Sequence, residues 1–518
     1  ICENIHGRER NMTTAHICIM AAIIVYLGAM IFVGYLCSKN NNDSSDFYLG
    51  GRKLGPLVTA MSAEASDMSS WLLMGASRSG LSDRYCRRRM DCHRTRHRNV
   101  HKLEDRSKTD PPLHSRSRQF DHASSFFSNR YRDQRKILQS IGAIFIVIFF
   151  IPYTASGFAA CGKLFSSLFG VNYVAAMIIS AIVIVGYTAL GGFLAASTTD
   201  FIQSIIMSVA LIIVFIFGIN IAGGIPAVVE NAQSLPGYLT MMTTYDPVAG
   251  VEQPYPIINI ISMIAWGLGY FGMPHILLRF MAIEDEEKLT LSRRVATIWV
   301  VISLAVAVLI GVIGLAMSDV GALKTLTGSD SETIIVQIAD LLSKHGILPA
   351  LLAGTILAGI LASTMSTADS QLLAASSCVS QNLFCDCMGL KLSKKSSMLM
   401  ARLTVVVIAI IGVFLARNPN SSVFRIVSFA WAGFGATFGA VMLFSLFWKR
   451  TNRNGALAGM IVGGVMVFIW KYLIAPLGGL FGIYELLPAF LCSAAAIVVV
   501  SLLTAPPSQE IVDEFESV

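Results

Sequence analysis

The sequence contains few charged residues, and what it lacks argues against most classes of soluble protein. Only 14% of its 518 residues are charged, whereas a soluble globular protein carries about 25%. The ten cysteines show no metal-ligand spacing, and we interpret them as packing residues or free thiols. Because no paired nucleophile and base and no metal cluster stands out, the sequence does not indicate an enzyme.

Long apolar runs take the place of charge. Hydrophobic residues make up 54% of the chain. The runs are about 20 residues long, which is the length of helix that crosses roughly 30 Å of hydrocarbon. Lipid offers no hydrogen bonds to the backbone, so such segments must be helical. We therefore predict an all-α polytopic membrane protein with a single transmembrane domain over 16–504. Twelve spans are visible, near 16–36, 55–75, 136–158, 172–193, 201–222, 256–280, 293–317, 347–375, 399–416, 423–447, 456–474 and 483–504.

The loops between these spans differ in charge. The longest clear loop, 223–256, contains no Lys or Arg, whereas five other loops are basic. Cytoplasmic loops carry an excess of Lys and Arg, so we expect 223–256 and the N-terminus outside and the short tail 505–518 in the cytoplasm. The basic loops lie at 39–53, 130–136, 288–294, 391–395 and 449–453.

The segment 76–124 breaks the pattern. It holds 13 of the 39 Lys and Arg residues and five of the nine His residues. The loops 39–53 and 130–136 both look cytoplasmic, yet only one visible span separates them, so one helix is missing. A one-base shift of the reading frame converts His–Arg codon pairs into codons for small or apolar residues. We therefore predict a frameshift that hides the third of about thirteen helices.

Other interpretations of 76–124 remain open. The segment could be a genuine basic loop, solvated or touching anionic lipid, and the chain could be a non-functional frameshifted copy. A zinc or nucleic-acid site finds no support, because no ligand spacing fits. The polar N-terminus, 1–15, contains Met12, and a start there would leave 1–11 untranslated.

Three stretches carry polar or helix-breaking residues at membrane depth. In "SAEASDMSSWLLMG", Asp67 lies among small residues, and an ionisable group inside the membrane suggests function. In "ILASTMSTADS", Ser363 and Thr367 share one helix face, and hydroxyls with freed carbonyls suit a hard cation such as sodium. The alternatives are a helix-packing seam for the first stretch and hydroxyls bonded to their own helix for the second.

The third stretch is "AWGLGYFGMPH", residues 265–275. Three glycines and Pro274 fall within eight positions, and interrupted helices are the sequence pointer to the midplane site of a transporter. Trp266 and Tyr270 are four residues apart, so we expect both rings to face that cavity. The similar stretch "SFAWAGFGATFG", 428–439, is typical of close helix packing.

Taken together, these stretches resemble the sodium/solute symporter family. The resemblance also includes "GGRKLGP", "PYTASGFAACGKLF", "GGFLAASTTD" and "RNGALAGM", and it covers about 17–505 except for 76–124. Within the family it is strongest to members that carry proline. It implies a core of two five-helix inverted repeats, each beginning with a helix that is unwound near the midplane.

The resemblance also implies functional residues. Arg52 and Asp67 match residues important for coupling. The implied sodium ligands are the backbone of Ala65, Met68 and Ser363 and the hydroxyls of Ser366 and Thr367. The implied substrate site comprises Trp266, Tyr270, Pro274, Tyr153, Ser69 and Ser70.

The function that follows is sodium-coupled uptake of L-proline by alternating access through a bacterial plasma membrane. Sodium is the coupling ion, and neither a nucleic acid nor an obligate protein partner is expected. The alternatives are symport of another small solute, such as pantothenate, a sugar or another amino acid, and a membrane-embedded sensor. A sensor would need an appended signalling domain, for which the polar residues after the last span are too few.

Overall fold

The computed structural model describes residues 14–39, 47–48, 50, 54–69, 71–76, 123–240, 242–246, 249–390, 393–418 and 422–516. Arg52 and Ser70 therefore lie outside the described residues, as does nearly all of the predicted frameshift and its hidden helix. These predictions stay untested by the structure.

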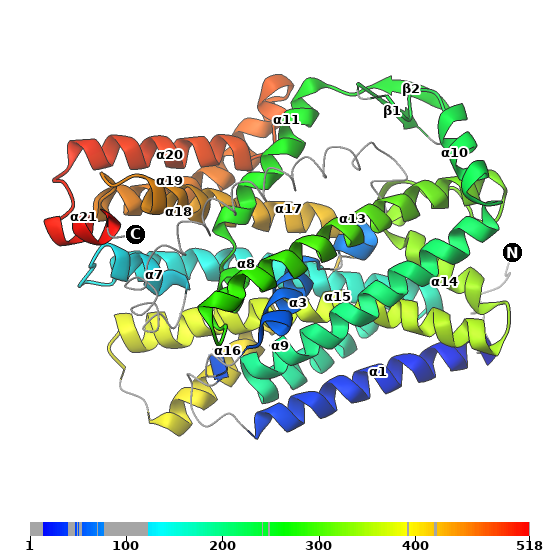
Figure 1. Ribbon diagram of the computed structural model, residues 1–518, viewed down its shortest axis with the longest axis horizontal. Helices are drawn as coiled ribbons and strands as arrows, with labels where there is room; N and C mark the ends of the chain where they lie inside the picture. The colour runs from blue at the N-terminus through cyan, green and yellow to red at the C-terminus, as the bar shows by residue number, and fades with distance from the viewer. Residues whose placement is uncertain are drawn as a thin grey trace, which may run out of the picture.

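Long helices lie side by side along the longest axis of the molecule (Figure 1). The helices that fall on the predicted spans are α1 (Thr14–Ser38), α3 (Pro56–Asp67), α8 (Ile137–Phe169), α9 (Tyr173–Ile221), α11 (Ile257–Ala265), α12 (Pro274–Met281), α13 (Leu289–Asp319), α15 (Ile347–Ser377), α16 (Lys394–Leu415), α17 (Val423–Phe434), α18 (Ala440–Phe447), α19 (Arg453–Ile469) and α20 (Leu486–Leu503). Shorter helices are α7 (Ala123–Arg130), α10 (Ile225–Ser234), α14 (Ile334–Ser343) and α21 (Gln509–Glu516).

All twelve predicted spans coincide with helical segments in the described residues. Nine helices there are long and apolar enough to cross a membrane, and a bent pair over Ile257–Met281 makes a tenth. Two predicted spans form the single 49-residue element α9, which is interrupted where Gly192 adopts a φ of 62°. Near 1.5 Å per residue, α9 is long enough for two crossings that meet at this glycine.

Two helices are broken in mid-span. α3 ends at Asp67, and a wider π-helical turn, η2 (Trp71–Ala76), follows it. α11 passes into a 3₁₀ segment, η3 (Trp266–Gly272), and then bends by 43° into α12. Pro274 is the first residue of α12, where proline needs no backbone N–H. Wider π-turns also occur in η6 (Cys378–Cys387), η7 (Gly435–Gly439) and η8 (Trp470–Ile474).

The loop without Lys or Arg is ordered rather than irregular. It contains α10 and a hairpin of β1 (Thr243–Asp246) and β2 (Val251–Pro254), paired antiparallel from Thr243 with Pro254 to Asp246 with Val251. The hairpin lies at the end of the molecule near the marked N-terminus, and the C-terminus lies at the opposite end (Figure 1).

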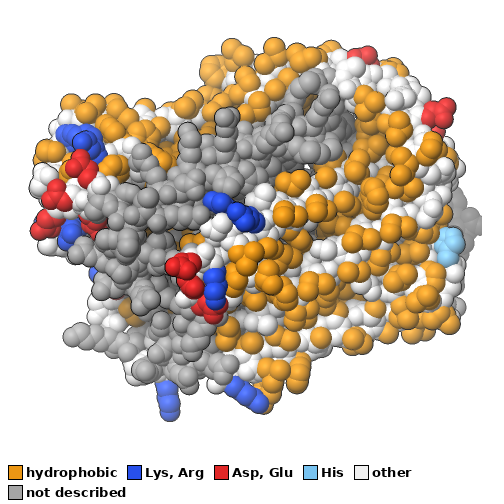
Figure 2. Space-filling model, in the orientation of Figure 1, with side chains coloured by type: hydrophobic (Ala, Val, Ile, Leu, Met, Phe, Trp, Pro, Cys, Tyr) orange, Lys and Arg blue, Asp and Glu red, His pale blue; other side chains and the backbone are white. Residues whose placement is uncertain are grey.

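The surface supports a membrane location. Between its two ends the molecule shows a broad band of hydrophobic side chains (Figure 2). Ile24, Val25, Ile182, Ile216 and Ile302 are among the large apolar residues that are more than half exposed. A soluble protein rarely exposes so large a contiguous apolar surface.

Candidate ion and substrate site

The break after α3 frees a backbone carbonyl. Met68 has φ −85° and ψ 53°, which is not helical, and the Ser69 N–H donates to the Asp67 carbonyl at 3.0 Å. In an unbroken helix the Ser69 N–H would bond to the Ala65 carbonyl four residues earlier. The Ala65 carbonyl is therefore available to groups outside its own helix.

Two hydroxyls of α15 use that carbonyl. The Ser366 hydroxyl donates to the Ala65 oxygen at 2.9 Å, and the Thr367 hydroxyl lies 3.5 Å from the same oxygen. Both hydroxyls also lie near the Ser363 carbonyl, at 3.3 Å and 3.2 Å. Four of the five predicted sodium ligands thus meet at one point between α3 and α15.

This oxygen cluster fits a sodium ion. Met68, the fifth predicted ligand, is the residue at which α3 stops, and it is fully buried. Hard cations prefer oxygen ligands, and the cluster combines hydroxyls with carbonyls. The hydroxyls bond across to the other helix, so the alternative that they bond only within α15 is wrong for Ser366.

A buried ion pair lies beside the cluster. Arg279 of α12 and Asp200 of α9 are joined at 3.1 Å, with exposed side-chain fractions of 1% and 0%. Asp200 also accepts hydrogen bonds from Ser62 at 2.7 Å and Ser66 at 3.1 Å, both on α3. The pair therefore links three helices around the break in α3.

The network continues into α15. Ser370 is hydrogen-bonded to the Arg279 guanidinium, to Ser66 and to Asp369. The second Asp369 oxygen accepts a hydrogen bond from the Tyr187 hydroxyl of α9 at 2.7 Å. Since Ser370 also donates to the Ser366 carbonyl at 2.7 Å, the charged network and the oxygen cluster share the same turn of α15.

Sequence reasoning missed Asp200, Arg279 and Asp369. Asp200 and Asp369 were each part of a stretch used for the family resemblance, but neither was assigned a role. The rule that flagged Asp67, an ionisable group at membrane depth, would have flagged these residues too.

Aromatic rings surround the second broken helix. Trp266 is only 7% exposed because its ring stacks on four others. The centroid distances are 5.9 Å to Trp71, 5.6 Å to Phe424, 5.4 Å to Trp431 and 5.9 Å to Tyr484. Trp71 comes from η2 and Trp266 from η3, so this stack joins the two broken helices.

The expected reason for Trp266 and Tyr270 to lie together is wrong. Residues four apart share a face in an α-helix, but η3 is a 3₁₀ helix with three residues per turn. Trp431 joins the two instead, because its ring also meets Tyr270 edge-on at 4.7 Å.

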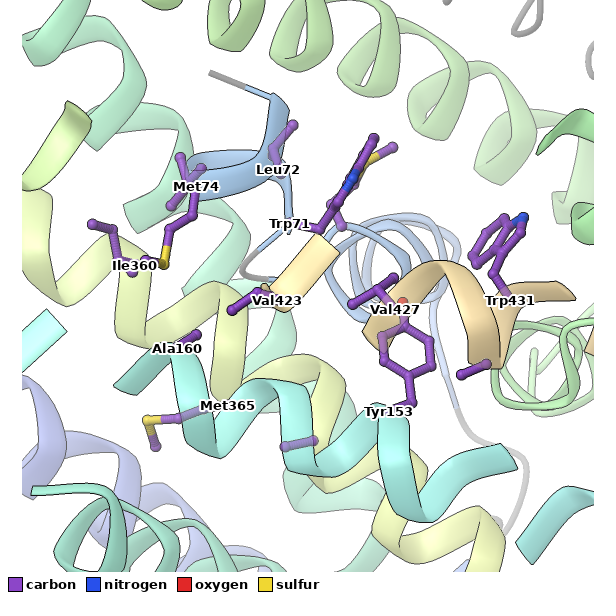
Figure 3. Close-up of a cluster of buried hydrophobic side chains, with 14 of the residues drawn as sticks. Trp71, Leu72, Met74, Tyr153, Ala160, Ile360, Met365, Val423, Val427 and Trp431 are labelled. Carbon is purple, nitrogen blue, oxygen red and sulfur yellow. The ribbon is translucent and has the colours of Figure 1, made fainter. Parts of the chain in front are cut away.

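Tyr153 enters the same region from α8. It is 2% exposed, and Ser69 and Asp67 are among its polar neighbours. In Figure 3 the ring of Tyr153 of α8 points toward Val427 of α17. The described members of the predicted substrate site therefore lie around the breaks in two helices, close to the oxygen cluster of α3 and α15.

Comparison with known proteins identifies the family. The model of the sodium:solute symporter family matches residues 47–83 and 123–463. The chain belongs to the sodium:solute symporter family. The match leaves out 84–122, which falls inside the segment of unusual composition.

Similar proteins include named proline transporters. The osmoregulated proline transporter OpuE of Bacillus subtilis is 37% identical over 498 residues, covering 95% of this chain and 96% of OpuE. The sodium/proline symporter of Escherichia coli is 36% identical over 509 residues, with 94% of each chain covered.

Among solved structures, a Na⁺-coupled sialic acid symporter in a substrate-bound outward-open state has a TM-score of 0.77 at 19% identity, covering 95% of this chain and 99% of that chain. The nucleobase-cation-symport-1 family transporter MHP1 has a TM-score of 0.51 at 13% identity, covering 91% and 98%. These likenesses confirm the all-α transporter fold with its five-plus-five core, whereas the count of thirteen helices stays a prediction.

Proposed function

We propose that this chain carries L-proline into the cell together with sodium, by alternating access. The observation that carries the proposal is the oxygen cluster of Ala65, Ser363, Ser366 and Thr367, held where a transmembrane helix is interrupted. The names of the relatives, proline transporter and sodium/proline symporter, support the choice of solute and ion.

The geometry suggests how the ion and the solute are coupled. Sodium bound at the cluster would take over the oxygens that Ser366 and Thr367 now share with α3, and so would hold α3 against α15. Because Asp67 and Ser69 follow Ala65 directly, fixing α3 also fixes one wall of the substrate site. By linkage, sodium and proline must raise each other's affinity by the same factor.

The membrane potential drives accumulation. One charge moving across 100 mV supplies about 2.3 kcal/mol. At about 1.4 kcal/mol per tenfold change, this corresponds to about one and a half decades of proline accumulation.

We place the protein in a bacterial plasma membrane with its N-terminus outside and its C-terminus in the cytoplasm. Lys449 pairs with Glu516 of α21, and Arg453 pairs with Asp133, which lies three residues before Lys136. These basic residues therefore lie at the end of the molecule that carries α21. Because loops rich in Lys and Arg stay on the cytoplasmic side, we propose that this end faces the cytoplasm.

The substrate roles are proposals for each residue. Trp266 and Tyr270 would pack on the proline ring, and Pro274 would keep the helix interrupted. Tyr153 and Ser69 offer hydroxyls to the carboxylate or amine. Ser70 is proposed beside them on sequence alone, and Arg52 and Asp67 are proposed as coupling residues.

We further propose that the coding sequence of 76–124 is read here one base out of frame. Read in the restored frame, it would encode the third helix. The gap in the family match over 84–122 supports this. If the chain is made as printed, the proposal implies a non-functional copy that lacks one crossing.

The test is uptake of labelled proline into sealed vesicles that contain the purified protein, made both as printed and with the frame restored. An inward sodium gradient should drive accumulation by the restored form only. Equal accumulation in potassium buffer without a pH difference would end the sodium proposal. Absence of sodium-driven proline uptake, or stronger competition with labelled proline by pantothenate or a sugar than by unlabelled proline, would favour another solute.

A further inference from the structure

Trp431 lies at the junction between the two helices that carry the aromatic site. It is 2% exposed on α17, and its indole N–H donates to the Trp266 carbonyl at 3.0 Å. Trp266 is the residue at which α11 ends and η3 begins. The backbone changes from α to 3₁₀ winding at this residue, so the indole N–H adds a side-chain hydrogen bond at the point of interruption.

The same indole touches both proposed substrate rings. It stacks on Trp266 with an interplanar angle of 20° and meets Tyr270 at 84°. Trp431 therefore bonds to the backbone of Trp266 and contacts the rings of both Trp266 and Tyr270.

A glycine makes room for this indole. A Cβ added to Gly269 would lie 2.0 Å from the Trp431 indole nitrogen. A Cβ on Gly435 would lie 2.6 Å from the Gly269 Cα. The close approach of η3 to α17 and η7 thus requires glycine on both sides, with the Trp431 side chain beside the contact.

We propose that Trp431 is a positioning residue that sets the affinity and ring-size selectivity of the substrate pocket. The proposal rests on the proposed function, since it assigns Trp266 and Tyr270 to the solute. Because the indole N–H bonds to the Trp266 carbonyl, the distance between the Trp266 and Tyr270 rings stays fixed. Without that bond the rings shift, and a six-membered imino acid competes better with proline.

The first test is Trp431→Phe in the frame-restored protein in vesicles. It keeps a ring but removes the N–H. Loss of one such hydrogen bond predicts a rise on the order of fivefold in the proline concentration for half-maximal uptake. Pipecolate should compete better relative to proline, by a similar factor. Sodium affinity measured without proline, from sodium-dependent thermal stabilisation, should not change.

Trp299→Phe is the matched control. The Trp299 indole N–H donates to the Ser208 hydroxyl at 2.9 Å and joins α13 to α9, so it lies on neither η3 nor α17. Trp299→Phe also removes an indole hydrogen bond. It should leave the proline concentration for half-maximal uptake and the relative competition by pipecolate at their wild-type values.

Gly269→Ala provides a second route to the same displacement, because its new methyl group would push the intact indole away. Gly186→Ala is its control, since a Cβ there meets nothing within 4 Å. Gly269→Ala should move affinity and selectivity in the same direction as Trp431→Phe.

The outcomes separate this proposal from the proposed function. Folded Trp431→Phe and Gly269→Ala proteins with wild-type affinity and selectivity would overturn the positioning role. Loss of folding in both, with both controls folded, would assign Trp431 to core packing and overturn it as well. A wild-type protein that carries a different solute would refute proline, and the same two comparisons would then be made with that solute and its ring or chain homologue.

Discussion

The buried pair of Arg279 and Asp200 allows a quantitative prediction. Replacing Asp200 by Asn keeps the shape of the side chain but removes its charge. The guanidinium of Arg279, which is 1% exposed, would then have lost its directly paired carboxylate. Breaking a buried ion pair from one side costs roughly 3–5 kcal/mol, because a charge stays behind without compensation.

The size of the loss depends on what remains around Arg279. The guanidinium would keep its bonds to the His275 carbonyl at 2.9 Å and to the Ser62 hydroxyl at 3.1 Å, and Ser370 connects it to Asp369. These contacts favour the lower end of the range, about 3 kcal/mol. Removing both charges, with Asp200→Asn and Arg279→Gln, should cost less than the sum of the single changes, with a coupling energy of about 1–3 kcal/mol.

The assay is the free energy of unfolding of the detergent-purified protein, followed by tryptophan fluorescence without sodium or proline, so that ligand binding does not contribute. The exposed pair of Lys344 and Asp340, at 2.9 Å, is the control, and Asp340→Asn should cost at most about 1 kcal/mol. If Asp200→Asn costs no more than Asp340→Asn, or if the two charge removals simply add, the pair does not hold these helices together as we argue.

Three further changes test other parts of the structure. Thr367→Ala removes a hydroxyl from the sodium cluster and should raise the sodium concentration for half-maximal uptake about 5- to 30-fold, from roughly 1–2 kcal/mol; an unchanged sodium curve would remove Thr367 from the site. Trp266→Ala should weaken proline transport strongly, and wild-type half-saturation would contradict the aromatic pocket. Gly192→Ala places a Cβ 2.7 Å from the Phe47 carbonyl oxygen at a φ of 62°. It should therefore destabilise the protein clearly more than Gly170→Ala, because Gly170 has a similar φ but open space around it. Equal thermal stability of the two variants would refute a close contact at Gly192.

Some features of the fold could be predicted from the sequence because they depend only on local composition. A helix that crosses lipid needs about 20 apolar residues, whatever its neighbours are. All twelve predicted spans therefore fall on helical segments of the described residues, and nine of these helices, or ten with the bent pair, are long and apolar enough to cross a membrane. The break near Pro274 could also be predicted, since glycine and proline interrupt an apolar run in the sequence itself, whereas the break near Asp67 was expected only from the family resemblance. The sodium ligands came from the family resemblance, and the structure then brought four of them together.

Tertiary structure alone decided the contacts between residues far apart in the chain. Arg279 meets Asp200, 79 positions earlier, and nothing in either local sequence indicates the other. The winding of η3 was also not predictable, because glycine-rich segments permit both α and 3₁₀ geometry and packing against α17 selects between them. For the same reason Trp431 looked like simple packing: its indole N–H acquires a role only because the fold brings it to the Trp266 carbonyl, where another helix changes its winding.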